Sequence, residues 1–274
     1  MYDCIIIGSG CAGAVTANIL AQKGKKVLVI EKRSHIGGNC YDEKEEHGIL
    51  VHKYGPHIFH TNSRKVYDYL SRYTSWYDYR HEVEGYIHGQ YIPVPFNLNS
   101  LKLVYGEEKA AALTEKLIRE YGEGTKVPIL KLRENEDPDI RAIAEYVYQN
   151  IFLKYTMKQW GQKPEEIDPA VTGRVPVLIS YDNHYFQDAY QGMPADGYTP
   201  MFEHMLADEN IDVLTGTDAL GLLDFTGEKI LYQGKEFEGP VIYTGPIDEL
   251  FRCCFGRLPY RSLRSVSYTH LTLP

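Results

Sequence analysis

The 274-residue sequence is poor in cysteine and in net positive charge. Its five cysteines are an odd number, and the adjacent Cys253 and Cys254 are poorly placed to bond to each other. No disulfide framework is therefore expected, and a reducing cytoplasm is indicated. The net charge of −8 argues against nucleic acid as a general partner, because phosphate backbones require clustered Lys and Arg. A small anionic ligand needs only a few well-placed arginines, so this class of ligand stays open.

Long apolar runs are also missing, and none approaches the roughly 20 residues that cross a bilayer. The apolar N-terminus lacks the basic leader of a signal peptide. Internal repeats and low-complexity tracts are absent as well. The chain is expected to form one large or two smaller globular domains without membrane insertion. Its 23 tyrosines suit clefts that bind sugars and bases, although tyrosine also packs ordinary cores.

The first 31 residues predict the opening of a doubly wound α/β domain. Residues 2–7 and 26–31 are typical of buried parallel strands, and residues 11–23 predict a helix between them. The turn before that helix, Gly8-Ser9-Gly10-Cys11-Ala12-Gly13, fits G-x-G-x-x-G, and acidic Glu31 ends the second strand. This is the context in which the motif binds a dinucleotide.

Each residue of this motif has a physical role. Gly8 permits the tight turn, Gly10 lets the backbone approach a pyrophosphate, and Gly13 lets helix and strand pack closely. The helix N-terminus directs unpaired N–H groups and a favourable dipole at the phosphates. Glu31 is placed to accept from a ribose hydroxyl. The glycine pair of Gly37-Gly38-Asn39 resembles the E-x-R-x-x-x-G-G segment of flavoproteins, which favours FAD over NAD.

The rest of the chain predicts a helical insertion followed by short strands. A hairpin is expected over 83–94, helices over about 98–160 with one starting at Asp137-Pro138, and short strands from about 175 onward. Strands near 229–232 and 239–244 are expected to return to the first sheet. The fold class is α/β, a Rossmann-like FAD-binding domain with a helical insertion and a mainly antiparallel β-sheet domain that is incomplete. The expected boundaries are 1–80 FAD-binding, 81–150 helical, 151–208 antiparallel sheet and substrate, 209–246 FAD-binding again, 247–264 sheet, and 265–274 tail.

The stretch KYGPHIFHTN raises the question of a metal site, because His52, His57 and His60 lie close together. No cysteine supports them, no helix aligns them, and Gly55-Pro56 interrupts the run. Zinc sites need three or four ligands in fixed geometry. We therefore expect no metal.

The sequence resembles the UDP-galactopyranose mutase family over about residues 1–264. The resemblance rests on an ordered set of segments: YDCIIIGSGCAGAV, VIEKRSHIGGN, HKYGPHIFHT, YTMKQWG, RVPV, DNHYF…YQGMPADGYT and YTGPID. It implies an isomerase that interconverts UDP-galactopyranose and UDP-galactofuranose in nucleotide-sugar and cell-envelope polysaccharide metabolism. It further implies FAD in the reduced form, attack of flavin N5 on the sugar anomeric carbon, and a reductant for the flavin. Members of the family are often dimers, so a homodimer is expected by analogy.

The resemblance also implies roles for individual residues. Arg174 matches an arginine at the substrate diphosphate and is expected to stabilise the departing UDP. Tyr155 and Trp160 match residues that line the uridine and sugar part of the cleft. Phe152 and Tyr185 are expected as their companions. Core packing is the alternative for all four aromatics. His60 is expected nearest flavin N5, and His52 is expected to be a structural strand residue. The expected cofactor-binding residues are Gly8, Ser9, Gly10, Gly13, Glu31, Lys32, Gly37, Gly38, Asn39, His57 and Ile58.

Two departures from the family pattern concern the end of the chain. Cys254 stands where the family has an arginine that helps to hold the diphosphate, and a thiol offers no charged fork. The final SVSYTHLTLP does not resemble the family continuation. A truncated chain with weak FAD retention and poor activity is therefore expected.

Two other functions are compatible with the FAD-binding opening. One is an oxidoreductase like flavin amine oxidases or desaturases, which would consume an electron acceptor at every turnover. The other is a non-catalytic nucleotide-binding fragment. The segments that contain Trp160 and Arg174 favour the mutase.

Overall fold

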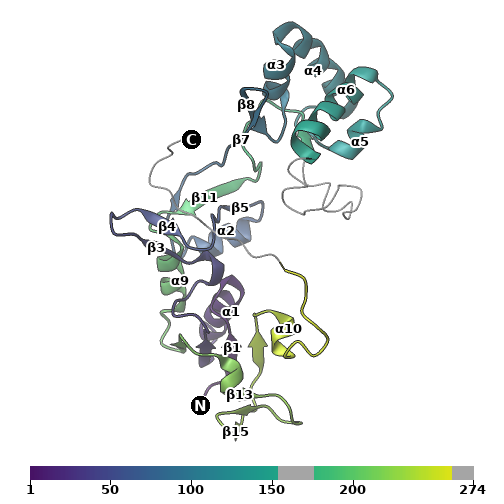
Figure 1. The fold of residues 1–274 in the computed structure, drawn as a ribbon. Helices are drawn as coiled ribbons and strands as arrows, with labels where there is room; N and C mark the ends of the chain where they lie inside the picture. The colour runs from purple at the N-terminus through teal and green to yellow at the C-terminus, as the bar shows by residue number, and fades with distance from the viewer. Residues whose placement is uncertain (154–175, 261–274) are drawn as a thin grey trace. The chain divides into compact units, whose positions relative to one another are not determined.

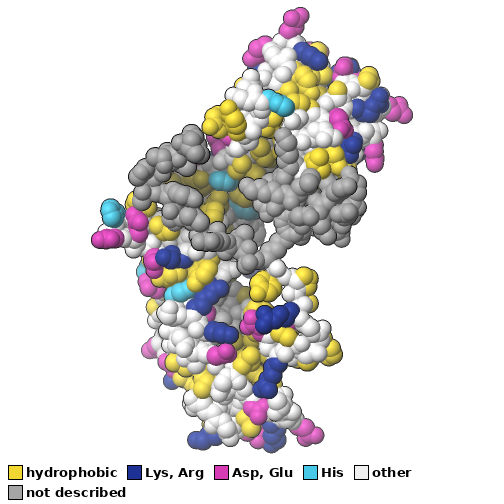
Figure 2. All heavy atoms as spheres, in the orientation of Figure 1, with side chains coloured by type: hydrophobic (Ala, Val, Ile, Leu, Met, Phe, Trp, Pro, Cys, Tyr) yellow, Lys and Arg dark blue, Asp and Glu magenta, His cyan; other side chains and the backbone are white. Residues whose placement is uncertain are grey.

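A computed structural model describes residues 1–153 and 176–260. The chain divides into two compact units, one formed by residues 1–79 and 189–274 and the other by residues 80–188. Tyr155, Trp160 and Arg174 lie outside the described residues. Within the described part, no helix is both long and apolar enough to cross a membrane. Basic and acidic side chains are interspersed on the face shown in Figure 2.

A parallel sheet forms the centre of the first unit (Figure 1). Its strand order is β12-β2-β1-β16, with all three neighbouring pairs parallel. The strands are β1 (Cys4–Ile7), β2 (Val27–Ile30), β12 (Ile211–Leu214) and β16 (Val241–Tyr243). β1 and β2 are uninterrupted runs of apolar residues, CIII and VLVI, and both are buried along their whole length. Such runs are typical of parallel strands covered on both faces, as the sequence predicts.

One face of this sheet is covered by two helices, α1 (Cys11–Ala21) and α9 (Tyr198–Leu206). Ala14 and Ala17 of α1 are fully buried and, being small, let the helix lie close to the strands. Phe202 of α9 completes the same apolar cluster. The side-chain amide of Asn18 donates to the Met205 carbonyl at 2.7 Å, which ties the two helices together.

The other face packs against a small antiparallel sheet, β13 (Leu223–Asp224), β14 (Leu231–Tyr232) and β15 (Lys235–Glu236). The prediction that a strand near 229–232 joins the first sheet is wrong, because the turn at Gln233-Gly234 returns β14 onto β15. The expected strand near 239–244 does join it, as β16 beside β1. β12, which the sequence did not single out, forms its opposite edge.

The remaining elements of the first unit are short. The hairpin β3 (Asp42–Lys44) and β4 (Leu50–His52) follows a 3-10 helix at Gly38–Cys40. β5 (Phe59–Thr61), β11 (Tyr190–Pro194) and β6 (Trp76–Tyr77) form an antiparallel sheet with β11 in the middle. Two further helices are α2 (Arg64–Leu70) and α10 (Ile247–Leu250).

The second unit is mainly helical. It contains the hairpin β7 (Val83–Ile87) and β8 (Gln90–Val94), the pair β9 (Lys126–Pro128) and β10 (Pro176–Leu178), a π-helical turn Tyr148–Phe152, and the helices α3 (Leu98–Tyr105), α4 (Glu107–Tyr121), α5 (Ile129–Arg133) and α6 (Pro138–Val147). The predicted hairpin is confirmed, with its turn at His88-Gly89. The predicted helix start is confirmed too, because the Asp137 carboxylate accepts from the Asp139 N–H at 2.8 Å.

The division into units differs from the predicted grouping of residues 151–208. Residues 189–208 belong to the unit that contains the parallel sheet, where β11 pairs with β5 and α9 packs on α1. The described residues 151–153 and 176–188 belong to the helical unit. The substrate role predicted for 151–208 stays a prediction.

Candidate cofactor site

The turn between β1 and α1 admits only glycine at two positions. Gly8 has φ +98°, and a Cβ there would overlap the hydroxyl oxygen of Thr244. That hydroxyl donates to the Ile7 carbonyl at 2.7 Å, so the end of β16 packs directly on the turn. A Cβ at Gly13 would overlap the carbonyl oxygen of Gly8. The turn therefore has the tight geometry and the close helix–strand contact that the motif predicts.

A second glycine loop packs against the first. The Gly37 N–H donates to the Ser9 carbonyl at 3.1 Å. A Cβ at Gly38 would lie only 2.9 Å from the Cα of Gly10, so the two backbones touch. Gly37 and Gly38 both have positive φ, +86° and +58°. The structure thus brings together the two glycine segments that the sequence predicted to bind one cofactor.

The N-terminus of α1 opens beside this contact. Gly10 is the N-cap and supplies no side-chain hydrogen bond to the first turn of the helix. The N–H groups of a first helical turn lack intrahelical partners and, with the helix dipole, favour an anion. A phosphate group is the ligand such an end binds best.

Glu31 is buried, with 6% of its surface exposed, and is fixed by the same loops. Its Oε2 accepts from the Ser9 N–H at 2.9 Å and the Ser9 hydroxyl at 2.7 Å. Its Oε1 accepts from the Arg33 N–H at 2.9 Å. Burial alone would raise the pKa of Glu31, but these hydrogen bonds hold that pKa below its ordinary value. The ionised carboxylate keeps acceptor capacity for a ribose hydroxyl.

Arg33 is a candidate site residue that the sequence predictions omitted. One guanidinium nitrogen, Nη2, donates to the Asn39 side chain at 2.9 Å, and the guanidinium lies 4.3 Å from the centre of the Tyr54 ring. The second terminal nitrogen, Nη1, is buried and has no hydrogen-bond partner within residues 1–153 and 176–260. A buried donor without a partner costs about 1–3 kcal/mol, so this nitrogen calls for an acceptor. The signal was present in the E-x-R part of the flavoprotein pattern.

Lys32 makes contacts different from those of its neighbour Arg33. Its ammonium group is exposed and forms ion pairs with Asp218 at 3.2 Å and Glu249 at 4.0 Å. It is thereby linked to α10, which contains Glu249, and to the segment after β12, which contains Asp218. A cofactor contact for Lys32 stays a prediction.

The histidine stretch is held by its own backbone. His52, on β4, accepts the His57 N–H at its Nδ1 at 3.0 Å, and burial lowers the pKa of His52, which favours this neutral acceptor form. The Nδ1 of His57 lies 2.9 Å from the Gly55 carbonyl. Ile58 is half-buried, and His60 is exposed on β5 opposite Gln191. No group of three metal-ligating side chains occurs in the described part of the chain.

Two of the predicted substrate residues are described, and both lie in the helical unit. Phe152 is fully buried and stacks on Tyr148 with ring centres 5.4 Å apart, so the packing alternative describes its position. Tyr185 is half-buried, and its N–H donates to the His81 carbonyl at 2.7 Å. Its ring meets Phe186 edge-on at 4.9 Å. Tyr185 is the more accessible of the two.

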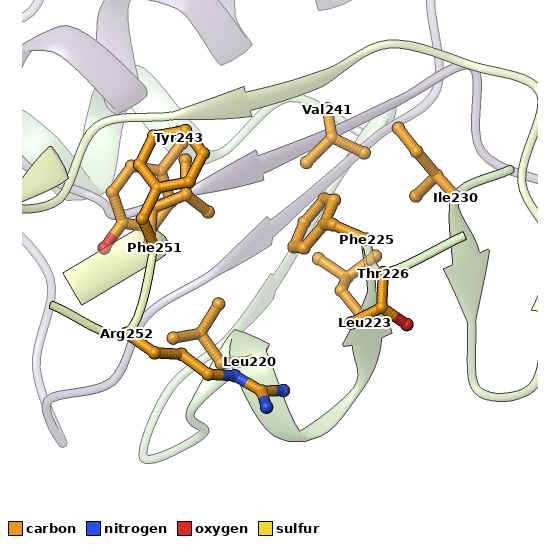
Figure 3. Close-up of a pocket in the computed structure, with 10 residues that line it drawn as sticks. Leu220, Leu223, Phe225, Thr226, Ile230, Val241, Tyr243, Phe251 and Arg252 are labelled. Atoms are coloured by element: carbon orange, nitrogen blue, oxygen red, sulfur yellow. The ribbon is translucent and has the colours of Figure 1, made fainter. Parts of the chain in front are cut away.

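An apolar cavity of about 490 Å³ opens on the face of the parallel sheet that lacks α1 and α9 (Figure 3). Figure 3 shows side chains from β13, β16 and the turn after α10 converging on it. Its lining consists of Leu220, Leu223, Phe225, Thr226, Ile230, Val241, Tyr243, Leu250, Phe251 and Arg252. Arg252 is the one charged residue in that lining.

Comparisons with known proteins agree on one family. A family model described as UDP-galactopyranose mutase matches residues 150–272, and one described as an NAD(P)-binding Rossmann-like domain matches residues 6–73. The chain is 38% identical over 264 residues to a dTDP-fucopyranose mutase of Escherichia coli, covering 96% of this chain and 68% of the relative. It is 34% identical over 265 residues to the UDP-galactopyranose mutase of Mycoplasma pneumoniae, covering 96% and 66%.

A solved structure shares the fold of this chain. A crystal structure of reduced UDP-galactopyranose mutase aligns with a TM-score of 0.59 and 19% identity over 92% of this chain and 57% of that one. This likeness shows a shared fold. The chain spans about two thirds of the length of the curated relatives it matches.

Proposed function

The chain belongs to the UDP-galactopyranose mutase family, and from that premise we propose that it binds FAD and interconverts the pyranose and furanose forms of a nucleotide sugar. The proposal is supported most by one observation: two touching glycine loops, a helix N-terminus, a buried carboxylate and a buried guanidinium nitrogen without a partner converge in one place. These groups match the phosphates and ribose of a dinucleotide. A bound and reduced flavin would supply a nucleophilic nitrogen, N5, for the anomeric carbon of the sugar.

The residues of this chain bind and orient the cofactor. The N–H groups at the start of α1 and the Arg33 guanidinium hold the pyrophosphate, and Glu31 accepts from a ribose hydroxyl. Lys32 and Asn39 border the same loops, and His57, Ile58 and His60 line the flavin. Residues with a positive charge near the phosphates matter because the chain as a whole is acidic, with a net charge of −8.

The substrate side is proposed from the family pattern. Arg174 binds the diphosphate of the nucleotide sugar and stabilises the departing nucleotide, and Tyr155, Trp160 and Tyr185 pack on its base and sugar. Phe152, which is buried in the core of the helical unit, is their companion in the same pattern. UDP-galactopyranose is the substrate we propose. Because a relative at 38% identity is a dTDP-fucopyranose mutase, dTDP-fucopyranose is the competitor to assay beside it.

An electron count separates this mutase from an oxidoreductase. We expect the purified chain, reduced once with dithionite under argon, to turn over the nucleotide sugar many times without spending further reductant. Admitting oxygen should stop turnover by oxidising the flavin, and oxygen uptake should not scale with substrate. Oxygen or acceptor consumption in step with substrate would contradict the proposal. Calorimetric binding of UDP without any conversion would indicate a nucleotide-binding fragment instead.

A further inference from the structure

Two cysteines face each other across the two glycine loops. Cys11 is the first residue of α1 and is exposed, and Cys40 ends the 3-10 helix Gly38–Cys40 and is half-buried. Their sulfur atoms lie 3.9 Å apart, although 29 residues separate them in sequence. The three other cysteines are elsewhere: Cys4 is buried in β1, and Cys253 and Cys254 follow α10.

The backbone around this pair is already in contact. Gly10, which precedes Cys11, touches Gly38, which lies two residues before Cys40. The Gly37 N–H donates to the Ser9 carbonyl in the same contact. A disulfide needs an S–S distance of about 2.05 Å, so the two sulfur atoms, now 3.9 Å apart, must approach by roughly 2 Å. Because the two loops already touch, they need not travel to meet before the bond closes.

We propose that Cys11 and Cys40 form a redox-reversible dithiol site, which closes into a disulfide that joins the two glycine loops. Aliphatic disulfides such as oxidised glutathione are the oxidants this site would take. A pair that opens and closes with the thiol pool is compatible with the reducing compartment that the odd number of cysteines indicates.

The chemistry balances as two exchange steps. The Cys11 thiolate attacks one sulfur of oxidised glutathione, forms a mixed disulfide and releases one glutathione. The Cys40 thiol then loses its proton and attacks the Cys11 sulfur, which forms the Cys11–Cys40 bond and releases the second glutathione. Both cysteines are oxidised and one external disulfide is reduced to two thiols.

The surroundings favour Cys11 as the attacking group. Its hydrogen bond with Cys40 and the backbone N–H at the start of the helix lower the pKa of the Cys11 thiol to about 7. The same hydrogen bond, followed by burial, raises the pKa of Cys40. The exposed cysteine is thus the nucleophile, and the half-buried one resolves the mixed disulfide.

Oxidation should also change how the loops exchange their ligand, a consequence that rests on the proposed function. If the loops hold the FAD phosphates, a covalent link fixes their separation. FAD loading and release, which need the loops to move, should both become slower in the oxidised chain. Reduction with dithiothreitol should restore the original rates.

Disulfide mapping tests the site without any cofactor. The background is the Cys253→Ser/Cys254→Ser variant, which removes the two thiols after α10. After treatment with oxidised glutathione, we expect a peptide that joins Cys11 to Cys40 and a loss of two hydrogens from the intact mass. In the same background, Cys40→Ser should instead keep a glutathione adduct on Cys11. A lasting adduct on Cys11 despite an intact Cys40, or two thiols that stay free, would overturn the proposal.

A second readout concerns the cofactor. The rate of FAD release can be measured by flavin fluorescence, with an excess of an apoflavoprotein that traps the released FAD. This rate should be several-fold lower for the crosslinked chain than for the reduced one. A Cys11→Ser/Cys40→Ser variant, which can form neither the crosslink nor the glutathione adduct on Cys11, should show no such dependence on oxidant. Equal rates for the crosslinked and reduced chain would refute the effect on exchange. Failure of either form to bind FAD would count against the proposed function, while the mapping still decides whether the disulfide forms.

Discussion

At the scale of single residues, Glu31 shows how a carboxylate can serve the fold and the ligand together. It accepts three hydrogen bonds from the loops on either side of it, and these hold its pKa below the ordinary value despite burial. An ionised group is thereby fixed where a ribose is expected. The same bonds make the glycine turn depend on the charge of Glu31.

Replacing Glu31 with Gln should destabilise the chain by about 1–3 kcal/mol at pH 7, because an amide group then faces the Ser9 donors. Since the folded-state pKa is lowered, the stabilisation by Glu31 is present above the ordinary carboxyl pKa and is lost as the pH falls through the folded-state value. Urea unfolding of both proteins at a series of pH values measures this. The difference should shrink toward acid pH. Glu46→Gln, in an exposed turn, is the control and should change little.

Arg33 is the residue whose role depends most on the cofactor. Arg33→Gln removes the guanidinium while leaving a polar side chain, and we expect FAD affinity to fall by roughly tenfold or more, since a hydrogen bond to a charged group contributes about 1.5–3 kcal/mol. Fluorescence titration with FAD measures the change. Lys25→Gln, an exposed site paired with Asp3, removes the same charge elsewhere. Equal losses in both variants would reduce the role of Arg33 to net charge.

Among the three histidines, His60 is the one predicted to lie nearest flavin N5 and to act in catalysis. If it donates or accepts a hydrogen bond at the flavin N5 region, His60→Ala should slow turnover of the reduced enzyme by up to about tenfold while FAD stays bound. The assay is steady-state conversion of the nucleotide sugar at saturating FAD. Because His60 is exposed on β5, its loss should leave the unfolding transition in place. Unchanged turnover would leave His60 no part in the reaction.

At the scale of elements, the β1–α1 turn depends on close packing that only glycine allows. Gly13→Ala would push a Cβ into the Gly8 carbonyl, and overpacking of this kind costs about 1–3 kcal/mol. We expect a lower thermal unfolding temperature and weaker FAD binding. Gly221→Ala is the matched control, because a Cβ there meets no atom within 4 Å and the backbone needs no positive φ. If both variants melt alike, the packing argument is wrong.

Elements with local signals could be predicted from the sequence. The glycine turn, β1, α1 and β2 follow from contiguous apolar runs and one motif, and Asp137-Pro138 marked the start of α6 correctly. The partners of short strands could not be predicted in this way. β14 has two residues, and the turn that follows it makes β15 its partner. β12 joins the parallel sheet by pairing with β2, and no local sequence pattern indicates that pairing.

The same limit applies to the candidate site. The contact between Gly10 and Gly38 and the approach of Cys11 to Cys40 both join segments about 30 residues apart. The burial of Nη1 of Arg33 likewise depends on how the chain folds around it. The motif placed each glycine segment near a cofactor but carried no information on these side chains. Arg33 was visible in the E-x-R pattern, while the cysteine pair had no sequence signal beyond its position beside the two motifs.

At the scale of the whole molecule, the two compact units have different proposed roles. The unit with the parallel sheet contains every group assigned to the cofactor, and the helical unit contains Phe152 and Tyr185. The faces of the parallel sheet are covered unequally: α1 and α9 close one, and the other keeps an apolar cavity of about 490 Å³. Apolar surface of this kind favours further packing.

We propose above that the glycine loops hold the FAD of a nucleotide-sugar mutase. The most direct test incubates the FAD-loaded, dithionite-reduced chain with UDP-galactopyranose and follows UDP-galactofuranose by chromatography. We expect furanose formation up to an equilibrium mixture, many turnovers per flavin, and the same mixture when the reaction starts from the furanose. The proposal would be contradicted if reduced FAD is bound but neither UDP-galactopyranose nor dTDP-fucopyranose is converted to its furanose form.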